Sequence, residues 1–190
     1  LLPFVGMPEV EAWPYIAIGL LVVLIFWSRA LVHTLSFIGW PLEFGHTFVY
    51  FGATLIEAVA LSQVAHPAHW YALNTAYALA VWGLYAYDLR VVRRHAGDFS
   101  TPDERALLDD IVRDQRINIR FMMPAAVVFQ GFAWWLVHAH PKVFIEGGWH
   151  LLLAGMTLLF SVNYLLGGVR LLQRRHRWIV SRHAQELLES

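Results

Sequence analysis

Histidine is the residue type in this sequence best suited to chemistry, and the chain of 190 residues holds ten copies of it. A buried imidazole is the usual axial ligand of haem iron and a common ligand of other metals. Five histidines stand at the same set of ends of the apolar stretches: His66, His69, His138, His140 and His150. His33 and His46 stand near the opposite ends. For each of them the alternative is an interfacial histidine solvated by water or lipid headgroups.

A haem held between helices requires two imidazoles at equal depth on facing helices. On that basis we expect a haem b, or a quinone, to be bound by the set His46, His150, His33, His138 and Arg29. Arg29 joins this set because it lies one turn before His33, where a guanidinium can pair with a haem propionate. No catalytic residue is predicted.

Zinc or copper is the alternative ligand for the histidines, with His66, His69 and His140 as the candidate metal-binding residues. They lie at loop margins, and no carboxylate motif accompanies them. Because the sequence contains no His-Glu-x-x-His element, we do not expect a zinc protease. The absence of cysteine from the sequence excludes disulfides, iron–sulfur ligation and thiolate metal sites within this chain.

Glu57 is the one carboxylate well inside an apolar stretch. An ionisable group within a membrane is costly, which makes it a functional candidate. Glu57 follows His46 by eleven residues, about three helical turns, so both lie on one helix face and can form half of a proton or ion path. The alternative is a protonated or hydrogen-bonded glutamate that only holds helices together. Asn74, Gln130 and Asn163 are expected to hydrogen-bond between helices.

The elements that must position these residues are five apolar stretches, at approximately 12–37, 44–65, 70–87, 121–137 and 149–169. Each is about long enough to cross a ~30 Å hydrocarbon core at 1.5 Å per residue. Only helices and closed barrels span such a core, and the alternating segments of barrel strands are absent. We therefore predict an all-α membrane bundle with five transmembrane helices, forming a single domain over 1–190.

Arginines indicate the orientation of this bundle. All thirteen lie in or beside the connections on one side of the apolar stretches, and the other side carries one cation, Lys142. Because Lys and Arg are retained on the cytoplasmic side, the N-terminus is expected outside and the C-terminus in the cytoplasm. We predict a multi-pass protein of a bacterial or archaeal cytoplasmic (inner) membrane. The net charge of zero gives no reason to expect nucleic-acid binding.

Two charged segments are predicted to form helices on the cytoplasmic side. Thr101, Pro102 and Glu104 are typical of a helix start, and an amphipathic helix is expected over 102–120. The Arg-rich tail is expected to continue the last helix over 170–188. Either segment can be a solvated surface or the docking site of a cytoplasmic partner.

Four short motifs follow one another along the chain: residues 13–17 (WPYIA), 43–46 (EFGH), 67–70 (PAHW) and 150–158 (HLLLAGMTL). Together they resemble the cytochrome b (γ) subunit family of respiratory nitrate reductase and heterodisulfide-reductase-type membrane subunits. The resemblance implies five helices, two haems b held by four histidines, and electron transfer from quinol to cytoplasmic subunits. It implies His46 as the inner ligand and His150 as the outer ligand.

Two of the four family ligands are missing from this sequence. Ile56 and Glu57 stand where the second ligand of the second helix is expected, and Gly168 stands where the second ligand of the fifth helix is expected. The leading hypothesis is an integral membrane redox subunit of cytochrome b type, passing electrons between a quinone pool and a partner protein. One alternative is an ion or small-solute permeation protein using Glu57 and His46. The other is a non-catalytic structural or assembly subunit of a membrane complex.

The partners expected under these hypotheses are the lipid bilayer, a cytoplasmic redox subunit, and further copies or other chains in an oligomer. Enzymatic activity is left open by the sequence.

Overall fold

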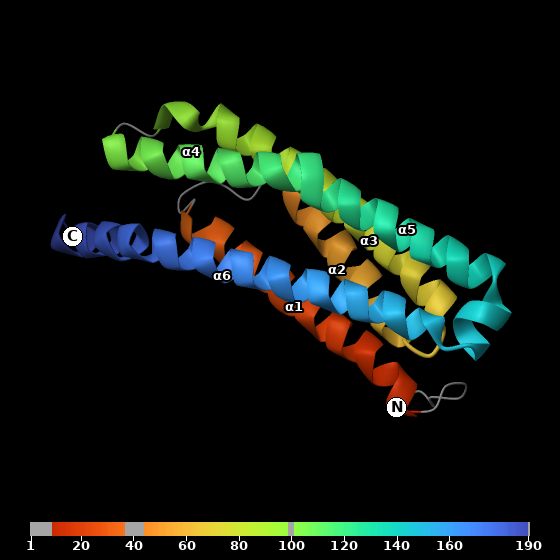
Figure 1. Ribbon diagram of the computed structural model, residues 1–190. Coiled ribbons are helices and arrows are strands. Elements are labelled where there is room, and N and C mark those ends of the chain that lie inside the picture. The colour runs from red at the N-terminus through yellow and green to blue at the C-terminus, as the bar shows by residue number, and fades with distance from the viewer. Residues whose placement is uncertain (1–8, 37–43, 99–100, 190) are drawn as a thin grey trace. The chain divides into compact units, whose positions relative to one another are not determined.

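The computed structural model describes the backbone of residues 9–36, 44–98 and 101–189, and side chains mainly within 11–29, 48–97 and 104–170. All regular structure in these ranges is helical, and they contain no strand, so the all-α prediction is confirmed. The α-helices are α1 (Glu9–Ser36), α2 (Phe44–Ser62), α3 (Pro67–Arg94), α4 (Pro102–Ile117), α5 (Met123–Ala139) and α6 (Trp149–Glu189) (Figure 1). Short 3-10 or π segments are η1 (Ala96–Asp98), η2 (Asn118–Met122) and η3 (Lys142–Glu146).

Three helical runs are long and apolar enough to cross a membrane: Glu11–Arg29, Glu104–Ala139 and Trp149–Arg170. They overlap the first of the predicted spans and contain the fourth and the fifth. The apolar part of α2, Phe48–Ser62, is shorter, and α3 is long enough but less apolar. By length and composition the described residues therefore belong to a membrane protein.

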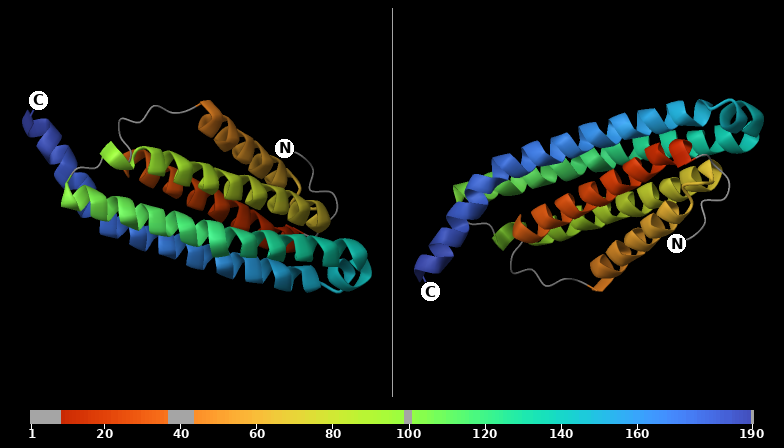
Figure 2. Two further views of the ribbon diagram at one scale, coloured as in Figure 1. Left: turned by 90° about the horizontal axis from the view of Figure 1, so that it is seen from above. Right: turned by 90° about the horizontal axis from the view of Figure 1, so that it is seen from below.

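The chain divides into two compact units. The first contains Leu1–Ala12 and Leu42–Leu153, and α3 lies at its centre. Helix α3 packs against α2 and α5, and it also contacts α4 and η2 (Figure 2). The second unit contains Trp13–Pro41 and Ala154–Ser190.

Helices α2 and α3 form an antiparallel hairpin. The amide of Gln63 donates to the carbonyl of Ala60 over 3.0 Å, and the amide of His66 donates to the carbonyl of Gln63 over 2.8 Å, which closes a tight turn. Pro67 then starts α3, as proline favours the first position of a helix. At the far end of the hairpin, a Cβ built on Gly45 would lie 3.3 Å from the hydroxyl of Tyr87. The start of α2 is thus in close contact with the end of α3.

A capping box starts α4, as the sequence predicts. Thr101 Oγ1 accepts from the amide of Glu104 over 3.3 Å, and the Thr101 amide donates to Glu104 Oε2 over 3.0 Å. Leu107 and Ile111, which form an apolar stripe on this helix, are buried. Since α4 packs against α3, this stripe contributes to the core of the first unit.

A π segment joins α4 to α5 without interrupting the helical run. The amide of Met123 donates to the carbonyl of Asn118, five residues back, instead of Ile119. Pro124 has no amide hydrogen, so it cannot donate to a carbonyl of the preceding turn. The wider turn is a local consequence of this proline, and it leaves the carbonyl of Ile119 open to another donor.

Two adjacent glycines connect α5 to α6. Gly148 has φ +73°, a left-handed conformation that other residues adopt only with strain. A Cβ on Gly147 would collide with the carbonyl oxygen of Val143. Because α6 starts immediately afterwards, these glycines determine the position of His150 on its first turn.

In the second unit, Arg29 of α1 contacts α6. The Arg29 guanidinium carbon lies 4.9 Å from the centroid of the Tyr164 ring, and Arg29 Nε would lie 3.6 Å from a Cβ on Gly168. Helix α6 itself continues without a break from Trp149 to Glu189. The Arg29 side chain thus lies against α6 near Tyr164 and Gly168.

Candidate functional site

Helix α2 buries one face, and Glu57 lies on it. Tyr50, Ala53, Glu57 and Ala60 recur at intervals of three or four residues, which places them on one side of a helix. Ala53, Glu57 and Ala60 are buried, and the exposed fraction of Glu57 is 6%. His46 continues this series along the backbone of α2, but its side chain lies outside the described residues.

The opposite face of α2 is apolar and exposed. It consists of Phe48, Phe51, Leu55 and Val59, and each of these side chains is at least half exposed. Such a face suits lipid, whereas the narrow small-residue face suits a neighbouring helix. The sequence of α2 therefore directs Glu57 away from lipid and towards α3, against which α2 packs.

The carboxyl of Glu57 has polar neighbours but an incomplete set of hydrogen bonds. It interacts electrostatically with the phenols of Tyr50 on α2 and Tyr77 on α3, and Tyr50 also interacts with Asp88 on α3. Glu57 Oε1 is buried and has no hydrogen-bond partner among the described residues. Glu57, the two tyrosines and Asp88 thus form a series of proton-carrying groups along the α2–α3 contact, which we call the α2–α3 ladder.

This environment limits what Glu57 can do. Burying an isolated carboxylate in apolar surroundings costs far more free energy than the packing of two helices provides. Such a group is therefore protonated, or it exchanges its proton with neighbouring groups. A phenol can both donate and accept a hydrogen bond, and is therefore suited to pass a proton on. The ladder has the chemistry of a proton relay.

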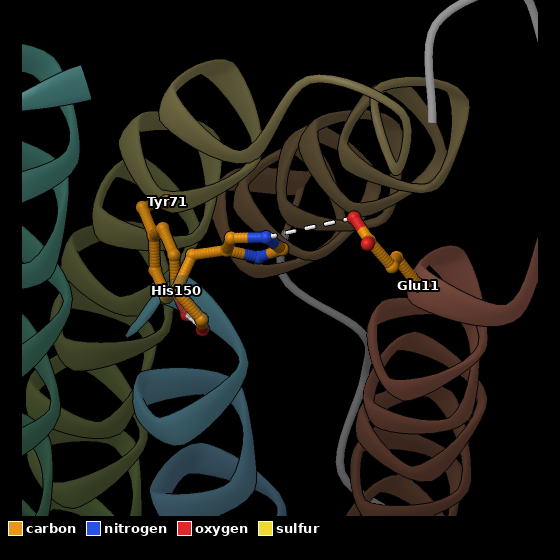
Figure 3. Close-up of polar contacts among 3 residues, drawn as sticks. All are labelled: Glu11, Tyr71 and His150. Atoms are coloured by element: carbon orange, nitrogen blue, oxygen red, sulfur yellow. Dashed lines mark hydrogen bonds and ion pairs between the residues drawn. The ribbon is translucent and has the colours of Figure 1, made fainter. Parts of the chain in front are cut away.

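A second buried group lies at the start of α6. The side chain of His150 has an exposed fraction of 0%, and its Nε2 lies 3.9 Å from Oε2 of Glu11, whose side chain is 39% exposed (Figure 3). The hydroxyl of Tyr71 donates to the backbone carbonyl of His150 over 3.1 Å. Tyr71 also packs edge-on against Trp70, with ring centroids 5.0 Å apart. The hydrogen bond from Tyr71 thus fixes the backbone at His150, and the His150 ring faces the carboxylate of Glu11, which solvent can reach.

The other predicted outer histidines are exposed and do not join His150 in a metal site. His66 and His69 have ring centroids 5.8 Å apart, whereas His138 stacks on Trp134 and His140 meets Trp135 edge-on, each at 5.9 Å. Among the side chains described, no three His, Cys, Asp or Glu residues form a group that can hold a metal ion. Of the predicted metal-binding residues, His66 and His69 are therefore the two that lie close together.

The predicted cofactor set is divided between the two units. His150 and His138 belong to the first, and Arg29, which contacts Tyr164, belongs to the second. The side chains of His33 and His46 lie outside the described residues. Of the histidines whose side chains are described, His150 alone is buried.

Some residues of both sites were not predicted from the sequence. Tyr50 was accessible to such reasoning, because it precedes Glu57 by seven residues, two full turns. Tyr77 and Glu11 were not, since their positions depend on how helices meet. The predicted interhelical role of two asparagines was wrong: Asn74 donates to Trp70 O over 2.9 Å and Asn163 to Leu159 O over 2.8 Å, each within its own helix.

No protein-family profile, no curated protein and no solved structure matches this chain significantly.

Proposed function

We propose that this chain is an integral membrane protein with five membrane-crossing helices, N-terminus outside and C-terminus in the cytoplasm, that conducts protons along the α2–α3 ladder. The observation that carries the proposal is Glu57: a carboxyl in an apolar helix, buried against α3, with an oxygen that lacks a partner among the described residues and with two phenols as neighbours. For this reason we favour the permeation hypothesis over the redox hypothesis.

The ladder covers much of the hairpin. Asp88 lies near the end of α3, which the cluster of Arg90, Arg93 and Arg94 assigns to the cytoplasmic side. Glu57 lies near the other end, since only five residues, about 7.5 Å of helix, separate it from Ser62 at the end of α2. Tyr50 interacts with both of these carboxyls, and Tyr77 interacts with Glu57 and with Tyr50.

Proton transfer along this series is chemically balanced. The Glu57 carboxyl gives its proton to a phenol oxygen, and the phenol releases its own hydrogen to the next acceptor, so that no phenolate accumulates. The Glu57 carboxylate then accepts a new proton from the side of the α2–α3 turn. Tyrosine and glutamate are both established proton carriers in positioned sites.

The same residues are poorly suited to metal cations. Calcium requires six to eight oxygen ligands, and magnesium a near-ideal octahedron. Glu57 is surrounded by Ala53 and Ala60 on its own helix face, which supply no ligands. A proton needs only one acceptor at a time, so it is the ion that this face can carry.

Reconstitution tests the proposal. The purified chain in liposomes, with a potassium diffusion potential imposed by valinomycin, should acidify the lumen as reported by a trapped pH dye. Protein-free liposomes measure the leak. Sodium flux under the same potential should stay at the leak. An equal proton leak with and without protein would contradict the proposal.

The redox subunit of cytochrome b type is the second candidate, because the one buried imidazole described is the residue that the family resemblance assigns as an outer ligand, His150. It would pass electrons between a quinone pool and a partner chain on the cytoplasmic side. Oxidised and dithionite-reduced absorption spectra of the purified protein test it. A haem Soret band that His150→Ala removes would favour this candidate over proton conduction alone.

A further inference from the structure

We propose that His66 and His69 bind one divalent transition-metal ion, of the class of Cu²⁺, Ni²⁺ or Zn²⁺, and that the bound ion slows proton entry to the ladder. The blocking part rests on the proposed function, whereas the binding part does not. The two side chains belong to the turn between α2 and α3 and the first turn of α3.

The geometry of the pair suits a shared ion. The ring centroids of His66 and His69 lie 5.8 Å apart, with ring planes tilted by 56°. Two imidazoles that bind one ion at about 2.0–2.1 Å place their centroids about 5 to 6 Å apart, so little more than ring rotation is required. Both side chains are exposed, which leaves the remaining coordination positions to water.

The sequence supports the pairing. His66 is the N-cap residue that precedes α3, and His69 lies three residues later in the first turn of α3, so a short stretch of chain carries both imidazoles. The closed turn formed by the His66 amide and the Gln63 carbonyl, 2.8 Å apart, holds the first of them in place. Imidazole favours zinc, copper and nickel over calcium or magnesium, which prefer oxygen.

One effect opposes binding. The start of α3 carries the partial positive charge of the helix dipole, which disfavours a cation there. The site is therefore expected to bind more weakly than a closed structural site with four ligands.

The position of the pair connects it with the ladder. His66 follows Glu57 by nine residues: the last five residues of α2 and the turn before Pro67 separate them. A proton that reaches Glu57 from this end of the hairpin passes the turn. A divalent cation there repels protons electrostatically.

Binding is measured first, with Cu²⁺ as the probe. The electron paramagnetic resonance spectrum of the detergent-purified chain at one equivalent of Cu²⁺ should show hyperfine splitting from two imidazole nitrogens. His66→Ala and His69→Ala should each weaken binding about tenfold or more and leave a one-nitrogen pattern. The matched control is His138→Ala, an exposed histidine stacked on Trp134, which should leave the spectrum unchanged. An unchanged two-nitrogen spectrum in His66→Ala and His69→Ala would overturn the site.

Blocking is measured separately, with Zn²⁺ added to the liposomes. Proton flux of the wild-type chain should fall, while flux of His69→Ala should keep its basal rate and lose its zinc sensitivity. If Cu²⁺ binds but the wild type shows no flux, the metal site stands and the proposed function fails. If flux exists and zinc inhibits both variants equally, the blocking role of this pair is wrong.

Discussion

The indole nitrogen of Trp82 donates a hydrogen bond to the carbonyl oxygen of Ile119 over 3.0 Å. This bond joins α3 to the π segment, where the amide of Met123 bonds to Asn118 and leaves Ile119 without its usual helical donor. Pro124 cannot replace that donor because it has no amide hydrogen. Trp82 therefore satisfies a backbone group that the π segment leaves open, and it fixes α3 against the centre of the α4–α5 run.

Replacing Trp82 by phenylalanine tests this relationship. Trp82→Phe keeps an aromatic ring but leaves a part-buried carbonyl without its donor, and we expect the free energy of unfolding to fall by about 1–3 kcal/mol. Thermal unfolding in detergent, followed by circular dichroism, measures the change. The control is Trp135→Phe on α5, where the ring is about half exposed. Equal losses in both variants would show that ring size, not the hydrogen bond, decides the effect.

The two glycines before α6 give a second prediction. Gly147→Ala places a Cβ against the carbonyl oxygen of Val143, and Gly148→Ala strains a residue at φ +73°. Each should lower the free energy of unfolding by about 1–3 kcal/mol. Gly155→Ala is the control, since nothing lies within 4 Å of its Cβ and alanine favours the helix. A stability of Gly147→Ala equal to that of Gly155→Ala would contradict the described turn.

The phenols of the ladder should contribute to proton flux. Tyr77→Phe removes a proton carrier beside Glu57 while retaining the ring, and we expect flux in liposomes to fall roughly tenfold or more. Tyr87→Phe is the matched control, because it removes a phenol of α3 that lies against Gly45, where α2 begins. If Tyr77→Phe conducts at the wild-type rate, then Tyr77 is not a step of the path.

The proposed orientation can be tested by cysteine labelling. Because the sequence contains no cysteine, a maleimide can label only the cysteine that a substitution introduces. In intact cells a membrane-impermeant maleimide should label Lys142→Cys and leave Arg105→Cys unlabelled until the cells are opened. Both positions are exposed. The reverse pattern would invert the orientation, and labelling of both from outside would contradict the predicted number of spans.

Sequence patterns were sufficient for the local structure and insufficient for the contacts between helices. The helix start at Thr101 depends on residues three positions apart, so it was predictable. The neighbours of Glu57 on α3 depend on how two helices are rotated against each other, which a single hydropathy pattern leaves open. The same reason explains Glu11, which lies far from His150 in the sequence and close to it in space.

The predicted spans differ in how well composition alone supports them. Three runs satisfy length and apolar content, while α2 is short and α3 carries more polar side chains. Residues that make α3 less apolar include Tyr77 and Asp88, two members of the ladder. The departure of α3 from a purely apolar helix thus coincides with the site proposed to carry protons.

The measurement that tests the central claim most directly is proton flux through Glu57→Gln, reconstituted at the same protein density as the wild type. This variant keeps the shape and the hydrogen-bonding capacity of the side chain but cannot release a proton. We predict that flux falls at least about 100-fold, to the leak of empty liposomes. Glu146→Gln, an exposed position in η3, should conduct normally, and Glu57→Asp should restore part of the flux. A folded Glu57→Gln protein that conducts at the wild-type rate would contradict the account and leave Glu57 as a structural contact between α2 and α3.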